Sequence, residues 1–331
     1  MSHAPPLGAL LCQYAAGSAL TCDPVDQGLL NRGYRLRTTR GRYFLKHHFD
    51  PETADPAAIA RQHRATQRLA DLGVPVAPPP AGRDGRTVAV VGGHAYALHP
   101  WVDGRHRHGG QLTTEQCGRL GALLGTVHAS LERVMTSAPA ARPTSADPAD
   151  TFELIDDLLR RVRRHRPRDA FDELALHRLT ERRALLEQHL DRRPPSGGSV
   201  GWVHGDFHPF NLLYRGDVPA AIVDWDRLGV EPPAEEAVRA AAIFFLRPVG
   251  TLDLAKVRAY ARAYRRTAGA RPGELATAVH RVWWERLNDF WMLRWHYERG
   301  DRRADAQFPA ASALAVWWTH TYDTVCDAFT R

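Results

Sequence analysis

In the first third of the chain, short apolar runs alternate with glycine and proline, a pattern that is typical of β-strands. Every second side chain of a strand lies on the same face, so Phe44 shares a face with Lys46. Gly92 and Gly93 separate two such runs and predict a tight hairpin. The strands predicted in this way are 35–39, 42–46, 87–91 and 94–98.

One helix interrupts this strand pattern, and a short one precedes it. Asp55 is a favourable cap, Pro56 suits a first helical turn, and Gly73 is a stop signal. Between them, inward positions recur every three or four residues, and Gln62 is one of these positions. The stripe consists of Ile59, Gln62, Thr66 and Leu69. Residues 7–16 predict a short helix without an assignable role.

Beyond residue 113 the spacing of the apolar residues becomes helical. A loop rich in Ala, Pro, Ser and Thr at 136–150 interrupts this region. A strand region followed by a mainly helical one predicts an α+β fold, and 331 residues are enough for two domains. The predicted helices are 114–135, 151–165, 172–191, 235–245, 252–268, 273–299 and 311–329.

Residues 200–226 depart from the helical pattern. Two apolar runs, 211–214 and 220–223, flank an Arg-Gly-Asp turn at 215–217 and predict a short β-hairpin. Since a hairpin returns its end beside its start, we expect the residues that flank it to converge.

Four of these flanking residues carry side-chain oxygens. Asp206 and Asn211 come just before the hairpin, and Asp224 and Asp226 just after it. Carboxylate and amide oxygens at one point suit Mg²⁺, a hard cation that takes few protein ligands together with phosphates and water. Ordinary turn chemistry is the alternative for any single one of them, because Asp and Asn favour loops.

The bulk composition is that of a soluble globular protein, with 44% hydrophobic and 24% charged residues. No apolar run approaches the length of about 20 residues that spans a membrane. The first residues lack a signal-peptide pattern. The four cysteines are scattered, which favours free thiols in a reducing compartment. We therefore expect a cytoplasmic protein without a membrane partner.

The balance of cationic residues singles out one lysine. The formal net charge is +7, but arginines spread among acids along helices indicate solvated faces better than a nucleic-acid surface. Of 44 Lys and Arg residues, only Lys46 and Lys256 are lysine. In a chain that uses arginine for almost every cation, a retained lysine indicates a site that needs a compact ammonium group and not a planar guanidinium. Lys46 ends an apolar strand, so it is a candidate anion ligand; a snorkelling edge lysine is the alternative.

The segment His204-Gly205-Asp206, with Asn211 five residues later and Asp224 thirteen further on, resembles the catalytic segment of aminoglycoside phosphotransferases and choline-kinase-like enzymes. The resemblance covers the chain beyond about its first 25 residues, and the motif is specific. It implies a bilobal protein-kinase-like fold, with a small N-lobe of antiparallel sheet plus helix and a larger, mainly helical C-lobe. The implied parts are a nucleotide-binding lobe at 1–99, a hinge at 100–104 and a helical lobe at 105–331.

This resemblance implies ATP or GTP and Mg²⁺ as cofactors. Asp206 would accept or orient the proton of an acceptor hydroxyl. Asn211 and Asp224 would hold the metal across the phosphates. Asp226 is a weaker candidate, for a second metal or for holding the local loop.

Nucleotide contacts are implied in the N-terminal lobe. Lys46 would pair with the α- and β-phosphates, as the strand lysine of kinases does. Gly28 and Asn31 lie in the loop that would cover the phosphates, although a plain hairpin turn explains them equally well. At the hinge, the Pro100 carbonyl and the Val102 N–H would contact adenine.

Three further residues are expected to support the site. Related kinases present a helix Glu to the strand lysine, whereas this chain has Gln62 at that position. Either Gln62 suffices, or an acid from 50–55 pairs with the lysine, or the lobe orders only with nucleotide. We expect His204 to brace the catalytic loop as a buried residue, and His208 to touch acceptor or phosphate.

The sequence says least about the identity of the acceptor molecule. Residues 283–297 are unusually aromatic, and packing is the default interpretation. Glu285 and Asp289 stand one helical turn apart and, with Glu231 and Glu235, are candidates for a pocket that takes a hydroxylated, cationic molecule.

The sequence therefore favours a small-molecule O-kinase, a monomer or homodimer that binds no nucleic acid. An aminoglycoside or other antibiotic is the first acceptor hypothesis, and a sugar, amino alcohol or vitamin is the second. A pseudokinase scaffold is a third, which Gln62 supports and the intact set of Asp206, Asn211 and Asp224 opposes.

Overall fold

The computed structural model describes residues 4–25, 31–49, 54–136 and 144–331. The chain forms two compact units. The first consists of 1–107, 130–137 and 204–229, and the second of 108–129, 138–203 and 230–331. The predicted acidic segment thus belongs to the same unit as the strand region, although about 100 residues of helix and loop separate them in sequence.

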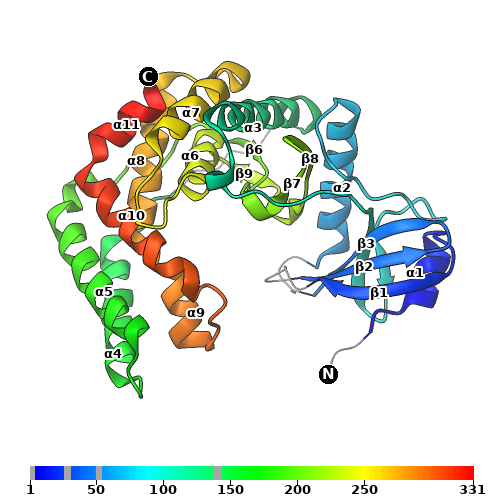
Figure 1. The fold of residues 1–331 in the computed structure, drawn as a ribbon, viewed down its shortest axis with the longest axis horizontal. Coiled ribbons are helices and arrows are strands. Elements are labelled where there is room, and N and C mark those ends of the chain that lie inside the picture. The colour runs from blue at the N-terminus through cyan, green and yellow to red at the C-terminus, as the bar shows by residue number, and fades with distance from the viewer. Residues whose placement is uncertain (1–3, 26–30, 50–53, 137–143) are drawn as a thin grey trace. The chain divides into compact units, whose positions relative to one another are not determined.

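An antiparallel sheet of five strands forms the centre of the first unit (Figure 1). Its spatial order is β1-β2-β3-β5-β4. The predicted tight hairpin is confirmed as β4–β5, and the strands expected at 35–39 and 42–46 correspond to β2 and β3. β1 was not predicted because it is a mostly exposed edge strand without apolar alternation. The strands are β1 (Ala19–Val25), β2 (Arg32–Thr38), β3 (Gly41–His48), β4 (Ala89–Val91) and β5 (His94–Pro100).

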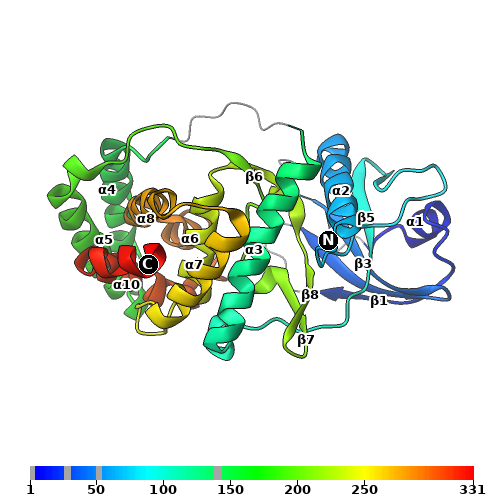
Figure 2. The ribbon, with the colours of Figure 1, turned by 90° about the horizontal axis from the view of Figure 1, so that it is seen from above.

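Two helices, α1 (Leu7–Gln13) and α2 (Pro56–Asp71), lie on opposite faces of this sheet (Figures 1 and 2). The predicted cap of α2 is confirmed, since the Asp55 carboxylate accepts the amides of Ala57 and Ala58. α1 closes the larger core cluster of the sheet. That cluster includes Leu10, Leu11, Leu36, Leu45 and Leu98.

The face under α2 carries the candidate lysine. Ile59 of α2 packs in one buried cluster with Ala95 of β5. Ala95 pairs with His48 across the sheet, and Lys46 lies two residues from His48 on the same strand. Because side chains alternate along a strand, Lys46 and His48 both face α2.

The predicted hairpin is confirmed as β7 (Leu212–Arg215) and β8 (Val218–Ile222). Its two strands are tied to different parts of the first unit. The Arg105 amide donates to the Tyr214 carbonyl at 3.0 Å, and the Ile222 amide donates to the Pro75 carbonyl at 2.7 Å. The segment after β5 and the connector after α2 therefore hold the hairpin in place.

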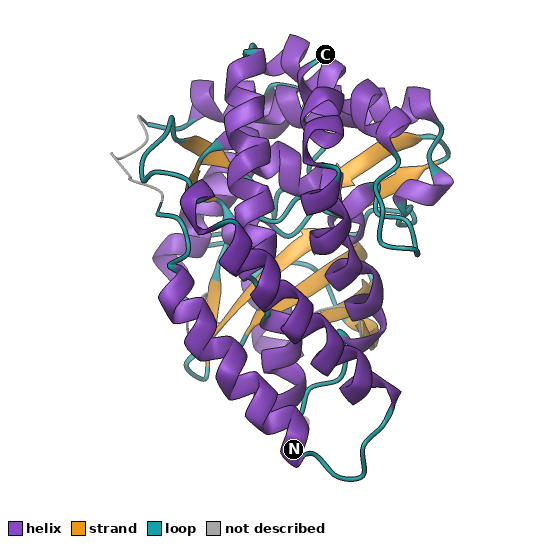
Figure 3. Cartoon of the chain, turned by 90° about the vertical axis from the view of Figure 1, so that its left-hand side faces the viewer, coloured by secondary structure: helices purple, strands orange, loops and turns teal. Residues whose placement is uncertain are grey.

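The second unit is almost wholly helical (Figures 2 and 3). Its aromatic interior supports the packing interpretation, because Trp283, Trp284 and Trp318 are fully buried. The last turns of α3 belong to the first unit. Short strands β6 (Gly201–Val203) and β9 (Gly229–Glu231) pair with each other. The helices are α3 (Thr114–Val134), α4 (Pro148–Arg164), α5 (Ala170–Gln188), α6 (Pro233–Phe244), α7 (Leu254–Ala268), α8 (Pro272–Asn288), α9 (Trp291–Arg299), α10 (Phe308–His320) and α11 (Tyr322–Thr330).

Several of these helices begin earlier than apolar spacing predicts. Pro148, Pro233, Pro272 and Pro309 all stand in a first helical turn, where their missing N–H costs nothing. Proline in the first turn therefore marks the start of these helices better than the first apolar residue does.

The single helix predicted at 273–299 is wrong. The chain leaves the helical conformation at Asp289, with φ −95° and ψ 123°, and resumes at Trp291. The Asp289 carboxylate accepts the Trp291 amide at 3.0 Å, so this acid caps the second helix. The helix predicted at 311–329 is likewise two helices, divided at Thr321.

Within the described residues, no helix combines the length and apolar character needed to cross a bilayer. The four cysteines are free, as expected.

Candidate active site

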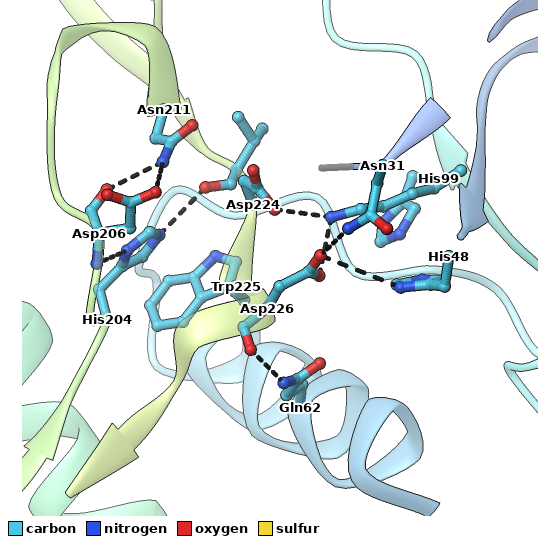
Figure 4. Close-up of polar contacts among 12 residues, drawn as sticks. Asn31, His48, Gln62, His99, His204, Asp206, Asn211, Asp224, Trp225 and Asp226 are labelled. Carbon is cyan, nitrogen blue, oxygen red and sulfur yellow. Dashed lines mark hydrogen bonds and ion pairs between the residues drawn. The ribbon is translucent and has the colours of Figure 1, made fainter. Parts of the chain in front are cut away.

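The β7–β8 hairpin brings its two flanking segments together. The Val223 amide donates to the Asn211 carbonyl at 2.9 Å. The His204 ring bonds the Val223 carbonyl through Nε2 at 3.0 Å. Asp206 and Asn211 therefore meet the segment that carries Asp224, as the hairpin geometry predicts (Figure 4).

The turn from His204 to Asp206 is specified by its backbone. His204 is fully buried, and its Nδ1 accepts the Asp206 amide at 3.2 Å, which leaves Nε2 as the protonated nitrogen. Gly205 has φ +83°, and a Cβ there would stand 2.1 Å from the Arg227 carbonyl oxygen. Only glycine meets both conditions.

The Asp206 carboxylate lies beside the Asn211 amide. Asn211 Nδ2 donates to the Asp206 carbonyl at 2.8 Å and lies 3.4 Å from the Asp206 Oδ2. His208 Nε2 stands 3.5 Å from the same Oδ2. Burial raises the pKa of Asp206, but the interactions with His208 outweigh it and lower the pKa below its usual range. Asp206 is thus a carboxylate at neutral pH.

Lys46 joins this group through Asp224 and Asp226. Its Nζ lies 2.6 Å from Asp224 Oδ1 and 2.7 Å from Asp226 Oδ1. Burial alone would lower the pKa of Lys46, but the two carboxylates outweigh it and raise the pKa. Lys46 is therefore a buried, charged amine and not a snorkelling edge lysine.

Asp224 has a strained backbone. Its φ of 60° and ψ of 65° lie in the left-handed region, which non-glycine residues seldom occupy. Such strain persists where the surroundings over-determine it, most often at functional sites. The strain turns the chain after β8 so that both Asp224 and Asp226 reach Lys46.

Asp226 is held from two further directions, and His48 stands nearby (Figure 4). Asn31 Nδ2 donates to its Oδ2 at 2.6 Å, and Gln62 Nε2 donates to its main-chain carbonyl at 2.7 Å. His48 Nδ1 lies 3.9 Å from the carboxylate. Burial raises the pKa of Asp226, although Lys46 opposes this shift.

Of the alternatives expected for the lysine partner, Gln62 as the direct partner is wrong; Asp50 and Glu52 lie outside the described residues, and ordering with nucleotide stays a prediction. Gln62 bonds the Asp226 main chain and not Lys46. Asp55, the acid of 50–55 that the structure describes, caps α2. The lysine pairs with Asp224 and Asp226, 178 and 180 positions further along the sequence, a separation that no local pattern reveals.

A family model described as the phosphotransferase enzyme family matches residues 21–270, well over half of the chain. The chain belongs to the phosphotransferase enzyme family. Its sheet-containing first unit and mainly helical second unit agree with the fold expected from the resemblance.

Several curated relatives of similar sequence are homoserine kinases. The chain is 24% identical to that of Paramagnetospirillum magneticum over 210 residues, which cover 63% of this chain and 59% of the relative. It is 24% identical to that of Methylobacillus glycogenes over 307 residues, which cover 90% and 87%. The chain therefore spans less than two thirds of the first relative's length.

Solved structures share the fold at lower identity. An aminoglycoside phosphotransferase from Alicyclobacillus acidocaldarius superposes with a TM-score of 0.65 at 15% identity, covering 98% of both chains. The amicoumacin kinase hAmiN gives a TM-score of 0.63 at 17% identity, covering 97% of this chain and 92% of that one. A microcompartment-associated aminopropanol kinase gives 0.63 at 17% identity, covering 98% of each.

The donor set in this phosphotransferase fits a magnesium ion that is shared with a nucleotide. Asn211 turns Nδ2 toward Asp206, so it offers Oδ1 to a cation. The Asp224 side chain is 46% exposed. Among the described residues, no three His, Cys, Asp or Glu side chains form a metal site by themselves. Mg²⁺ typically takes one or two protein ligands and completes its shell with phosphate and water.

The predicted hinge residues lie where β5 ends. Pro100 pairs with Tyr43 across the sheet, and the next amide, that of Trp101, donates to the Arg42 carbonyl at 3.0 Å. Val102 follows. In an extended strand, backbone groups of successive residues point to opposite sides, so the Pro100 carbonyl and the Val102 amide point away from the strand that Trp101 bonds. Gly28 lies outside the described residues.

Two buried histidines, His48 and His63, and the half-buried His99 stand near Lys46, and no sequence pattern singled them out. Burial lowers the pKa of His48 to about 2, of His63 to about 3 and of His99 to about 4. In the part of the chain that the structure describes, neither ring nitrogen of His48 has a hydrogen-bond partner. Alternation along β3 could have placed His48 beside Lys46, but it could not have placed the other two.

Three of the four acids predicted for an acceptor pocket gather around Arg239. Arg239 bonds Glu231 and lies 3.1 Å from Glu285 and 3.7 Å from Glu235. Arg281 also bonds Glu235, at 2.5 Å. Asp289, predicted one turn from Glu285, lies outside α8.

Proposed function

We propose that this phosphotransferase is a small-molecule O-kinase, which moves the γ-phosphoryl group of Mg²⁺-bound ATP to a hydroxyl group. The observation that carries this proposal is the meeting of Lys46 with Asp224 in the unit where Asp206 contacts Asn211. A buried amine, two metal-ligand oxygens and a carboxylate are the groups that phosphoryl transfer uses.

Each group has one role. Lys46 binds the α- and β-phosphates, and Asn211 and Asp224 hold the metal that neutralises charge on them. Asp206 orients the acceptor hydroxyl and accepts its proton, for which its lowered pKa keeps it ionised. His204 holds the loop, and His208 lies 3.5 Å from the Asp206 carboxylate, in reach of a ligand there.

The adenine contacts remain those predicted at the hinge, the Pro100 carbonyl and the Val102 amide. The Trp101–Arg42 hydrogen bond supports this proposal. Since Trp101 points its amide to β3, the backbone groups of Pro100 and Val102 point to the opposite side of the strand.

The acceptor is a small molecule that carries both a hydroxyl and an amino group. Homoserine and aminopropanol, named by the relatives and neighbours, share these groups, as do aminoglycosides. Glu231 and Glu285 are the predicted acids with exposed carboxylates, 48% and 40%, and they are our candidates for the amine contact. Buried Glu235 and the helix cap Asp289 serve the fold.

A panel of acceptors tests the proposal directly. The purified chain is incubated with Mg²⁺ and ATP or GTP, with homoserine, 1-amino-2-propanol, kanamycin, spectinomycin or no acceptor, and nucleoside diphosphate release is followed. We expect acceptor-dependent release with at least one amino alcohol. Asp206→Asn is expected to abolish it. Asp217→Asn, the same change on the exposed hairpin turn, is the control.

Tight nucleotide binding with no transfer to any acceptor would favour a pseudokinase scaffold over a kinase. Transfer only to the antibiotics would favour a resistance enzyme, and transfer to homoserine or aminopropanol a metabolic one.

A further inference from the structure

The two carboxylates on Lys46 differ in how they are held. The Asp224 carboxylate is 46% exposed, and among the described residues its hydrogen-bond partner is Lys46. The Asp226 carboxylate is 14% exposed and is bonded by Lys46 and Asn31. One acid is able to leave the amine, and the other is fixed.

We infer that Asp226 is the permanent counter-ion of Lys46, while Asp224 passes from Lys46 to the nucleotide-bound metal. Asn31 and Gln62 are the positioning residues of Asp226. The inference rests on the proposed function. It assigns to a residue after the hairpin the charge-pairing task that the resemblance assigns to a helix glutamate.

Gln62 explains why the helix acid is absent. Its Nε2 donates to the Asp226 main-chain carbonyl, and a carbonyl oxygen can only accept. A glutamate at this position would set a carboxylate oxygen against that carbonyl and lose the bond. The amide is therefore required, and Gln62 anchors the 3₁₀ turn Trp225–Arg227 to α2.

Asn31 fixes the same carboxylate from the sheet. It donates to Asp226 through Nδ2 and accepts the Phe49 amide through Oδ1 at 3.1 Å. Because both ends of its amide are used, it joins the start of β2, the end of β3 and Asp226. This makes Asn31 a positioning residue, whereas the sequence suggested direct contact with nucleotide.

A fixed counter-ion has a chemical consequence. Lys46 stays charged and in place when Asp224 turns to the metal, so one lysine serves both the resting site and the loaded one. If Asp226 instead ligated a second metal, Lys46 would lose both carboxylates on loading, and its buried charge would depend on phosphate alone.

The test compares Gln62→Glu with Gln67→Glu, the same charge change on the same helix. Among the described residues, the hydrogen bond of the Gln67 side chain is a long one, 3.4 Å to the Pro79 carbonyl. Nucleotide affinity is measured calorimetrically without metal, and kcat with Mg²⁺. We expect Gln62→Glu to weaken metal-free affinity and to lower kcat, each about tenfold, the scale of one lost bond to a buried polar group. Gln67→Glu should stay within about twofold of the wild type for both.

A Gln62→Glu variant that binds and turns over as well as the wild type would overturn the inference, since the new acid would then be pairing with Lys46. A wild-type chain that binds no nucleotide would instead refute the proposed function itself, so the two failures are distinguishable.

Asp226→Asn and Asp224→Asn separate the two acids by their magnesium dependence. We expect Asp224→Asn to raise the Mg²⁺ concentration for half-maximal activity at least about tenfold, as loss of a ligand does. Asp226→Asn should lower kcat with a nearly unchanged Mg²⁺ requirement. Equal increases in the two variants would show that Asp226 is a metal ligand. Should Asp226→Asn not fold, Asn31→Asp, which places a second carboxylate against Asp226, replaces it with the same expectation.

Discussion

The two units of this chain each gather acids around basic residues, but the ratio of acids to bases differs. In the first unit, one ammonium, that of Lys46, faces the carboxylates of Asp224 and Asp226, with Asp206 carried by the same hairpin. In the second, Glu231, Glu235 and Glu285 share Arg239, and Glu235 also bonds Arg281. The first group holds surplus negative charge, and the second is closer to neutrality.

This difference indicates which group awaits a metal ion. Surplus carboxylate near a half-exposed oxygen attracts a divalent cation, whereas matched pairs hold helices together. The type of basic residue in each group agrees with this interpretation. The Arg239 fork of α6 bonds Glu231 and Glu285 at once, whereas the compact ammonium of Lys46 lies between the carboxylates of Asp224 and Asp226.

The largest effect is expected from Asp206→Asn, which removes the proposed base and keeps the shape of the side chain. We predict that kcat falls at least about 10²-fold, the usual scale for a positioned acid–base group, with nucleotide affinity largely kept. Steady-state kinetics with the best acceptor and calorimetric nucleotide binding measure the two quantities. Turnover within a few-fold of the wild type would remove Asp206 from the mechanism.

Removing an arginine from the charge cluster of the second unit should lower the stability of the protein. Arg281→Met leaves Glu235 buried without its bonded partner, which costs about 3 kcal/mol of unfolding free energy. Urea unfolding measures the loss, and the Mg²⁺ requirement of the folded enzyme should not change. A large change in Mg²⁺ requirement at full stability would mean that this cluster also belongs to the metal site. Arg271→Met, at an exposed pair, is the control.

Lys46→Arg keeps the charge and changes its shape. A planar fork does not fit between Asp224 and Asp226 at 2.6 and 2.7 Å, so we expect kcat/KM for nucleotide to fall about tenfold. Lys256→Arg, at the only other lysine of the sequence, is the matched control because its Nζ bonds a main-chain carbonyl. Equal kinetics of the two variants would return Lys46 to a structural role.

The buried histidines predict a smaller, pH-dependent effect. Burial lowers the pKa of His48 from 6.5 to about 2, so between these values the unfolded chain binds a proton that the folded chain does not. Its contribution to stability is therefore full above pH 6.5 and declines as the pH falls below it. Between pH 7 and 5.5 the decline is about 1 kcal/mol for this residue.

His48→Phe should remove that part of the pH dependence without lowering stability at pH 7, because neither ring nitrogen has a partner among the described residues. Unfolding free energies at the two pH values provide the check. An unchanged pH slope in the variant would show that His48 is protonated in the folded state.

Local signals predicted the hairpin and the meeting of its flanks, because a turn of three residues between apolar runs has few other outcomes. The cap at Asp55 and the β4–β5 hairpin followed from similar signals. Apolar spacing failed at Asp289, where an acid that caps the next helix ended the preceding one.

Contacts across long sequence separations could not be predicted. Gln62 was assigned to Lys46 on the resemblance, and its bond to Asp226, 164 positions away, depends on how α2 packs on the turn after β8. The same holds for Asn31, whose partner lies 195 positions away. The sequence singled out the residues of the candidate site, and packing decided which of them bond to one another.

The central claim is that Asp224 helps to hold a metal on a bound nucleotide. Calorimetric titration with ATP, with and without Mg²⁺, tests it most directly in the wild type and in Asp224→Asn. We predict at least about tenfold tighter binding with Mg²⁺ in the wild type and little or no gain in the variant. An equal gain in both proteins would contradict the account.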